Sequence, residues 1–306
     1  MVRFVLPCPY RYPQREPVEN RNRSILMTRH ILTLSCRDRP GIVHTVASAL
    51  LAIEANIVES AQFSDDETRL FFMRTAFDSP IGDADAIRTT IVAATAGLTP
   101  TLDVRQEANR CRTLILVSKL DHCLLDLLYR WRAGDLPIDV VGVASNHETC
   151  RPIAQQYGVP FEFIPVTEDT KPQAEARMLD LAKASRVDLL VLARYMQILS
   201  DATCAQLVGS AINIHHSFLP GFKGARPYHR AHTRGVKLIG ATAHYVTSAL
   251  DEGPIIEQDV VRVGHVEPAE RLAAIGRDVE RRVLSHAVRL HAQRRVFLNG
   301  VRTVVF

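Results

Sequence analysis

Apolar and polar residues alternate near the start of the chain and then change to a helical spacing. Residues 30–36 read HILTLSC, a pattern rich in β formers, and the next residues, 38–41, read DRPG and favour a turn. From Ile42 to Ile53 the apolar residues recur at near-helical intervals, so one stripe of a helix is expected to face a sheet. The pattern therefore predicts a strand, a turn and an amphipathic helix in that order.

Two further runs favour a hairpin. Residues 57–64 and 70–77 are suited to strands, and the acidic, polar segment 65–68 between them is suited to a turn. A second helix is predicted over 83–96 and a last strand near 98–104. The resulting βαββαβ order is typical of the ferredoxin-like fold, which by itself carries no function.

The first strand-to-helix turn carries a recognisable motif. Residues 37–43, RDRPGIV, resemble the ACT family of regulatory modules, which pair through their sheets and often bind amino acids. The resemblance implies an effector site near this loop, with Asp38 and Gly41 as its candidate residues. The alternative is that Pro40 and Gly41 only start the helix, because a turn needs such residues in any case.

From residue 113 the pattern changes to compact apolar runs, at 113–117, 140–144, 189–193 and 211–214. Helical stretches such as 121–131 and 172–185 separate them, which predicts an α/β, mostly parallel sheet with both faces covered. The polar stretch 105–112 is the expected boundary between the two parts. Ligands of such sheets lie beyond the carboxyl ends of the strands, so candidate chemistry is sought there.

Composition narrows the classes of function. The net charge of +4 is small for 306 residues, with no basic run after the first thirty, so nucleic acid is not an expected partner. No apolar stretch approaches the roughly 20 residues of a membrane helix. The six cysteines are scattered without a C-x-x-C pair, which favours a reducing, cytoplasmic location. Residues 1–26, rich in Pro and Arg, are predicted to be a disordered tail, and Met27 is an alternative start.

The strongest chemical signal is the segment 212–220, INIHHSFLP. With the period of two that strands have, Asn213 and His215 share one face. Asp251 lies in a later loop, where Gly253 and Pro254 favour a turn. An amide that stabilises an oxyanion, an imidazole that moves protons and a carboxylate that orients it are suited to acyl transfer. A single strand histidine is more often structural, so only the constellation supports this interpretation.

Two other kinds of site are disfavoured. Histidines cluster in this half, but adjacent His215 and His216 are expected to point to opposite faces of a strand, and His229-x-x-His232 lacks the glutamate of metalloproteases. We therefore expect no metal. The first βα turn, residues 117–123, contains no glycine, which disfavours a phosphate cradle and a nucleotide-type co-substrate.

Several segments together resemble the formyltetrahydrofolate deformylase family. They are NIHHSFLP (213–220), KGARPYH (223–229), GATAHYV (240–246) and LDEGPII (250–256), and the likeness extends from Met27 onwards. It implies a Rossmann-like formyltransferase sheet and hydrolysis of 10-formyltetrahydrofolate to tetrahydrofolate and formate. It also implies a supply of formate for purine synthesis, balanced one-carbon folate pools, and no cofactor, since the folate is the substrate.

The resemblance implies a role for each candidate residue. Asn213 would bind the formyl oxygen, His215 would transfer the proton, and Asp251 would hold the water or steer the imidazole. Residues 193–199 match a family segment that lines the pterin pocket, although the sequence alone favours a plain strand-to-helix linker. The candidate substrate contacts are Arg194, Met196, Gln197, Ile198, Leu199, Leu250 and Gly253.

The same resemblance divides the chain into a tail (1–26), an ACT-like regulatory domain (27–108) and a formyltransferase-type catalytic domain (109–306). It suggests methionine or glycine as effector and a homo-oligomer formed through ACT pairing. Two other functions stay open. A formyltransferase would pass the formyl group to an amine, although His216 stands where transferases commonly have proline. In a non-catalytic amino-acid sensor the ACT-like domain would carry the function, and the α/β domain would have only a structural or binding role.

Overall fold

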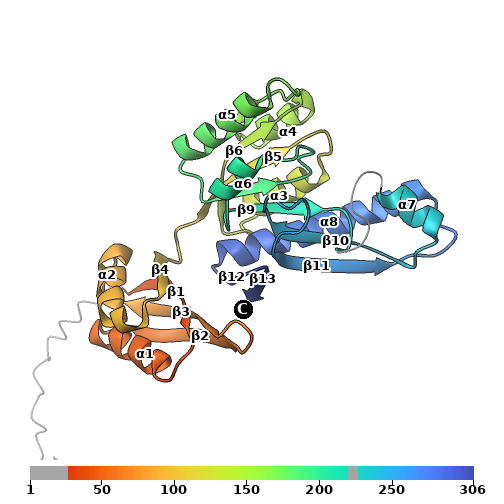
Figure 1. Cartoon of the computed structure of the whole chain (residues 1–306). Coiled ribbons are helices and arrows are strands. Elements are labelled where there is room, and N and C mark those ends of the chain that lie inside the picture. The colour runs from red at the N-terminus through yellow and green to blue at the C-terminus, as the bar shows by residue number, and fades with distance from the viewer. Residues whose placement is uncertain (1–26, 220–226) are drawn as a thin grey trace, which may run out of the picture.

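The computed structural model describes residues 27–219 and 227–306, which form two sheets and a C-terminal hairpin (Figure 1). The predicted tail at 1–26 lies outside the described residues, as do residues 220–226, which hold part of two of the family motifs. No helix in the described part of the chain is long and apolar enough to cross a membrane.

The N-terminal sheet has the strand order β2-β3-β1-β4, with every neighbouring pair antiparallel. Its elements follow the predicted βαββαβ order: β1 (Thr28–Arg37), α1 (Ile42–Ala52), β2 (Asn56–Asp65), β3 (Leu70–Ser79), α2 (Ala84–Ala94) and β4 (Thr101–Gln106). One boundary was wrong: Ala96–Leu98 form a 3₁₀ turn, so the last strand begins later than residue 98. Leu98 is buried in that turn against the core, which explains its strand-like apolar character.

The helices of this unit cover one face of its sheet. In α1 the side chains of Ile42, Val46 and Leu50 are buried, as the predicted stripe requires. They pack with inward-facing residues of β1 and β3, such as Leu34 and Phe77, in one apolar cluster. Burial of this stripe, more than helix propensity, is what stabilises a helix of eleven residues.

The second sheet has seven strands in the order β11-β10-β9-β8-β5-β6-β7. Strands β9, β8, β5, β6 and β7 are parallel, and β10 and β11 are antiparallel to their neighbours. The strands are β5 (Cys111–Val117), β6 (Ile138–Ser145), β7 (Phe161–Phe163), β8 (Leu189–Leu192), β9 (Ala211–His215), β10 (Leu238–Tyr245) and β11 (Ile255–Arg262). All four predicted apolar runs are strands of this sheet, which confirms a mostly parallel α/β architecture.

Helices cover both faces of this sheet, and two apolar cores result. The helices are α3 (His122–Arg132), α4 (Arg151–Gln156), α5 (Lys171–Ala184), α6 (Asp201–Gln206), α7 (Pro227–Arg234) and α8 (Ala269–Ala292), with a 3₁₀ turn at Glu148–Cys150. Buried side chains of α3, α4 and α8 share one core with the sheet, and those of α5 and α6 share the other. The long helix α8 packs against one face of β9 and β10, where it can support a site on the other face (Figure 1).

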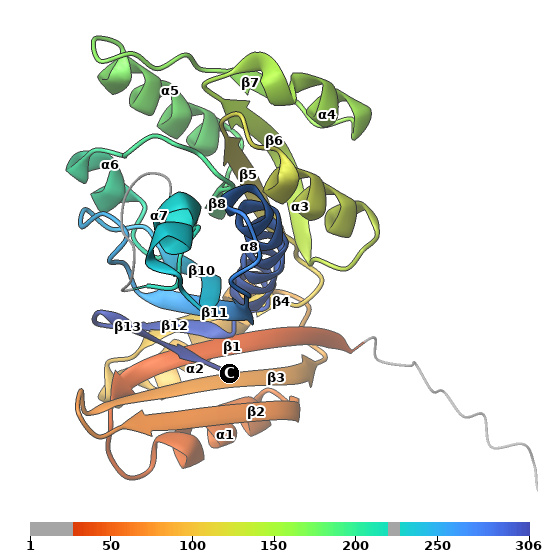
Figure 2. The same ribbon diagram turned by 90° about the vertical axis from the view of Figure 1, so that its right-hand side faces the viewer.

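A C-terminal hairpin joins the two units, and sequence analysis did not predict it. Strands β12 (Val296–Asn299) and β13 (Arg302–Val305) lie between the N-terminal sheet and β11 (Figures 1 and 2). The ring of Phe297 meets that of Phe72 edge-on at 5.8 Å, and the Asn299 amide donates to the buried Asp65 carboxylate at 2.5 Å. The N-terminal unit is thus attached to the second one by apolar and polar contacts.

Candidate active site

Strand β9 supplies the first two candidate residues. Its register with β10 sets His215 opposite Thr242 and Asn213 opposite His244. Ile212 and Ile214 are buried in the core on the α8 side. The side chains of Asn213 and His215 therefore share the other face of the strand, as the period of two predicted.

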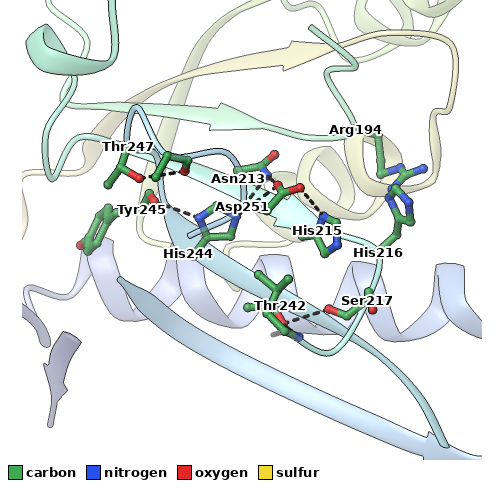
Figure 3. Close-up of polar contacts among 12 residues, drawn as sticks. Arg194, Asn213, His215, His216, Ser217, Thr242, His244, Tyr245, Thr247 and Asp251 are labelled. Atoms are coloured by element: carbon green, nitrogen blue, oxygen red, sulfur yellow. Dashed lines mark hydrogen bonds and ion pairs between the residues drawn. The ribbon is translucent and has the colours of Figure 1, made fainter. Parts of the chain in front are cut away.

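Asp251 reaches these two side chains from the loop after β10. Its Oδ2 lies 3.1 Å from His215 Nδ1, and its Oδ1 accepts a hydrogen bond from Asn213 Nδ2 at 3.5 Å. Figure 3 shows the carboxylate between the amide and the imidazole. Three residues that are far apart in the sequence are thus brought together as predicted. The other ring nitrogen of His215, Nε2, is buried and has no hydrogen-bond partner among the described residues.

His244 is a fourth member of the site, and the sequence did not indicate a role for it beyond its place in the motif GATAHYV. Its Nδ1 lies 2.9 Å from the carbonyl oxygen of Tyr245, so this nitrogen carries the proton and donates. Nε2 then accepts from Asn213 Nδ2 at 3.2 Å. This bond orients the Asn213 amide, so His244 fixes the group proposed for the formyl oxygen. The signal for this position would have been the motif GATAHYV: an antiparallel strand at this motif, paired with β9, sets His244 opposite Asn213.

The surroundings of Asp251 keep it ionised. Burial alone would raise the pKa of its carboxyl, but the hydrogen bond from His215 outweighs burial and holds that pKa well below its ordinary value. A carboxylate that stays charged at neutral pH can hold Nδ1–H of the imidazole, which leaves Nε2 with a lone pair for proton transfer.

A cavity of about 290 Å³ opens beside these residues and contains most of the predicted substrate contacts. Arg194, Met196, Gln197, Ile198, Leu199 and Leu250 line it, together with Asn213, His215 and Asp251. Met196 and Ile198 are 58% and 59% exposed, so they present apolar surface to an incoming ring. The segment after β8 thus lines the cavity, and its contact with the substrate stays a prediction.

Gly253, by contrast, does not line this cavity. A Cβ at this position would lie 1.7 Å from the carbonyl oxygen of Tyr245. The glycine thus lets the loop lie against β10, which brings Asp251 back over the site. Close backbone packing thus explains the glycine, and its contact with the substrate stays a prediction.

The glycine-free first turn supports the cavity-lining segment. Ser118 N–H donates to the carbonyl oxygen of Arg194 at 3.3 Å, and Met196 N–H donates to Ser118 Oγ at 2.9 Å. Ser118 Oγ in turn donates to Asn146 Oδ1 at 2.7 Å. These bonds fix the path of the segment after β8, a function of the turn that the sequence did not indicate.

One expectation about the histidines was wrong. The rings of His215 and His216 do not point to opposite faces, but stack with centroids 5.0 Å apart and 23° between their planes. Strand β9 ends at His215, so the alternation of faces no longer applies to the next residue. Burial, with added charge from Arg194 and His215, lowers the pKa of His216 to about 3, and its ring is neutral.

The Arg194 side chain lies next to the His216 ring, on the side away from Asp251 (Figure 3). Its Nη1 is hydrogen-bonded to His216 Nδ1, and its Nε lies 3.5 Å from Oε2 of Glu280 on α8. Arg194 borders the cavity, but its guanidinium is engaged with the protein, and its contact with the substrate stays a prediction.

One group of described residues offers metal-ligand atoms within 4.8 Å of one another: His122, Cys123 and Glu280. The Glu280 carboxylate already accepts from His122 at 2.8 Å and from Tyr228 at 2.6 Å, and it faces the Arg194 cation. Burial raises the pKa of the Cys123 thiol well above its usual value, so it is not a thiolate. These charges and bonds are suited to a hydrogen-bond network, and the expected lack of a metal stays a prediction.

The two candidate effector residues lie together in the exposed loop between β1 and α1. Gly41 has φ 93° and forms the N-terminal cap of α1. Asp38 N–H donates to the carbonyl oxygen of Arg69 at 2.9 Å, and the residue is exposed. Positive φ explains the glycine without any ligand, so an effector site at this loop stays a prediction.

Comparisons with known proteins agree with this geometry. Residues 111–288 match the formyl transferase family. A formyltetrahydrofolate deformylase from a Corynebacterium species is 51% identical over 279 residues, which are 90% of this chain and 98% of that protein. One from a Synechocystis species is 45% identical over 279 residues, covering 90% and 97%.

A solved structure shows the same similarity in three dimensions. The crystal structure of formyltetrahydrofolate deformylase from Burkholderia mallei superposes with a TM-score of 0.88 at 50% identity, and covers 91% of this chain and 99% of that one. The match includes the N-terminal unit as well as the second sheet. This chain belongs to the formyltetrahydrofolate deformylase family.

Proposed function

We propose that this chain hydrolyses 10-formyltetrahydrofolate to tetrahydrofolate and formate. The observation that carries the proposal is the meeting of Asn213, His215 and Asp251 beside a partly apolar cavity, in a chain of this family. The pterin would lie against Met196 and Ile198, which places the formyl group near the polar end of the cavity.

The geometry supports one sequence of steps. One Nδ2–H of Asn213 stays on His244 Nε2, and the other exchanges its long contact of 3.5 Å with Asp251 for the formyl oxygen. There it stabilises the negative charge that develops. His215 Nε2, which is free of protein partners among the described residues, takes a proton from water as the oxygen–carbon bond forms. It gives this proton to N10 as the carbon–nitrogen bond breaks. Asp251 holds Nδ1–H throughout and stabilises the imidazolium.

Formate release tests the reaction and separates it from its rivals. Purified protein is incubated with 10-formyltetrahydrofolate, with and without glycinamide ribonucleotide as amine acceptor. Equal amounts of formate and tetrahydrofolate without acceptor support hydrolysis. Turnover that requires the amine would show a transferase, and no turnover in either case would leave the amino-acid sensor.

We further propose that the reaction needs no cofactor, because the amide, imidazole and carboxylate supply the oxyanion contact and the proton transfers themselves. Dialysis against a chelator should then leave kcat unchanged.

The five described cysteines are buried free thiols, which supports a cytoplasmic location. There the released formate would feed formate-consuming steps such as purine synthesis and balance the folate pools.

For the N-terminal unit we propose an ACT-type regulatory role with methionine or glycine as effector. Its strand order and the exposed Asp38–Gly41 loop support this proposal. Titration calorimetry with each amino acid tests it. Asp38→Asn should weaken binding, and Asp66→Asn, which alters an exposed turn, is the matched control.

A homo-oligomer formed through this unit is the partner we propose. Strand β2 is an edge strand, and three of its apolar side chains, Ile57, Val58 and Phe63, are 41%, 48% and 46% exposed. An edge with this much apolar surface is suited to pairing with a second copy. Light scattering after gel filtration should give a multimer, and Val58→Lys should reduce its mass.

A further inference from the structure

A buried charged network lies behind the catalytic imidazole, and the proposed reaction does not use it. Its centre is Glu280, a residue of α8 that is only 1% exposed. The carboxylate accepts hydrogen bonds from His122 Nε2 at 2.8 Å and Tyr228 Oη at 2.6 Å, and Arg194 Nε lies 3.5 Å away. These donors hold the pKa of Glu280 below its ordinary value although burial would raise it. Glu280 is therefore an anion buried among its donors.

Arg194 connects this anion to the site. One end of its guanidinium faces Glu280 and the other donates to His216 Nδ1. Since a guanidinium only donates, His216 Nδ1 must accept, which fixes the neutral tautomer with the proton on Nε2. The His216 ring stacks on His215, so the chain of contacts runs from α8 to the catalytic imidazole.

The charged and titratable groups around His216 come from every neighbouring element. They are Arg194 after β8, His215 in β9, Tyr228 in α7, Asp251 after β10 and Glu280 in α8. The Arg194 cation favours a neutral His216, and a second cation stacked on His215 would oppose an imidazolium there. Glu280 is the carboxylate partner of Arg194 among the described residues. Without it, the buried guanidinium would be expected to move.

We propose that Glu280 is a positioning residue for the hydrolysis, holding Arg194 so that a neutral His216 packs against His215 and fixes the plane of the catalytic ring. The inference rests on the proposed function. It assigns Arg194 to the support of His215, in place of contact with the folate. A loss of this support should lower kcat, whereas a loss of substrate contact should raise KM.

Kinetics of four variants test this assignment. Glu280→Gln and Arg194→Gln should each lower kcat by about 10- to 100-fold, because small misplacements of a catalytic group have effects of that size. KM should stay within about twofold. The double variant should be no slower than the slower single one, since both act through one pair. Asp278→Asn, an exposed change on the same helix, is the control and should leave kcat unchanged.

The opposite kinetic pattern would overturn the proposal: a raised KM with kcat intact in Arg194→Gln, or losses that multiply in the double variant. Should Glu280→Gln fail to fold, Tyr228→Phe removes one donor without changing charge. It should lower kcat by a smaller factor with KM unchanged, and an unchanged kcat would count against the network.

A measurement independent of turnover keeps this inference separate from the proposed reaction. Nitrogen-15 NMR of the imidazoles should show His216 unprotonated at Nδ1 and not charged at pH 5, with nuclear Overhauser contacts to the His215 ring. Glu280→Gln should weaken these contacts and Asp278→Asn should not. A charged His216 at pH 5 would refute the positioning role even in an active enzyme. Inactive wild-type protein would refute the hydrolysis, while the spectra would still decide whether Glu280 holds the two rings.

Discussion

Replacement of Asp251 by asparagine tests the core of the proposed mechanism. The change keeps the size of the side chain and removes its charge. At 3.1 Å from His215 Nδ1, a full charge pair is worth about 5 kcal/mol at an effective dielectric constant of about 20. The amide oxygen of asparagine can still accept a hydrogen bond, so about 3 to 4 kcal/mol of the stabilisation of the imidazolium should be lost.

That loss corresponds to a decrease in kcat of about 10²- to 10³-fold. Formate release at saturating folate measures it, and circular dichroism checks that the variant folds. Binding of a folate analogue should change by less than about twofold, because Asp251 acts mainly on the transition state. Asp259→Asn on β11, where the carboxylate forms an ion pair with Arg282, is the matched control. A kcat for Asp251→Asn within threefold of wild type would refute the assigned role.

Three further outcomes are expected. Gly253→Ala should lower kcat by about 10²-fold or more, because its Cβ would lie 1.7 Å from a backbone oxygen and push the Asp251 loop outward; formate release checks this. In Gly276→Ala the new Cβ would lie 2.0 Å from Tyr228 Oη, so urea denaturation should show a loss of about 1 to 3 kcal/mol. Burial lowers the pKa of His216 and of His291 to about 3; the unfolded chain binds more protons, so stability should fall as pH drops below about 6.5, by about 1.4 kcal/mol per pH unit for each imidazole. Between pH 6.5 and 5, the unfolding free energy of His291→Asn should change with pH about half as steeply as that of the wild type. An unchanged slope would contradict a neutral, buried His291.

The two large sheets could be predicted because their strands have clear patterns of apolar residues. Continuous apolar runs such as 113–117 and 189–193 indicate strands buried on both faces, and both are strands of the second sheet. The C-terminal hairpin turns at Gly300-Val301, and a glycine at the first of two loop residues is typical of such a turn. Its contact with the N-terminal sheet had no such signal, because the bond from Asn299 to Asp65 joins residues 234 positions apart.

The sequence likewise predicted some residues of the candidate site and not others. Period-two spacing placed Asn213 and His215 on one face, and the family motif added Asp251. Nothing in the sequence indicated Glu280, which stands on a long helix among other charged residues. Its role depends on the distance between α8 and the segment after β8, and tertiary packing alone sets that distance. Residues that bear on the chemistry directly were therefore easier to find than the residue that supports them.

The backbone at two residues of the site is strained, and residue type did not predict this. Arg194 and Asp251 both border the cavity, and both have positive φ, 64° and 56°, where glycine or asparagine is usual. Each such residue costs about 1 kcal/mol or more and persists only where surrounding contacts determine it. For Asp251 those contacts are the hydrogen bonds to the catalytic residues, and for Arg194 they are Glu280 and His216. Left-handed backbone at these positions turns the Asp251 side chain toward His215 and the Arg194 side chain toward His216. The interactions that hold the imidazole are thus the same ones that offset the strain, so a variant that releases either side chain should relax its loop as well as slow the reaction.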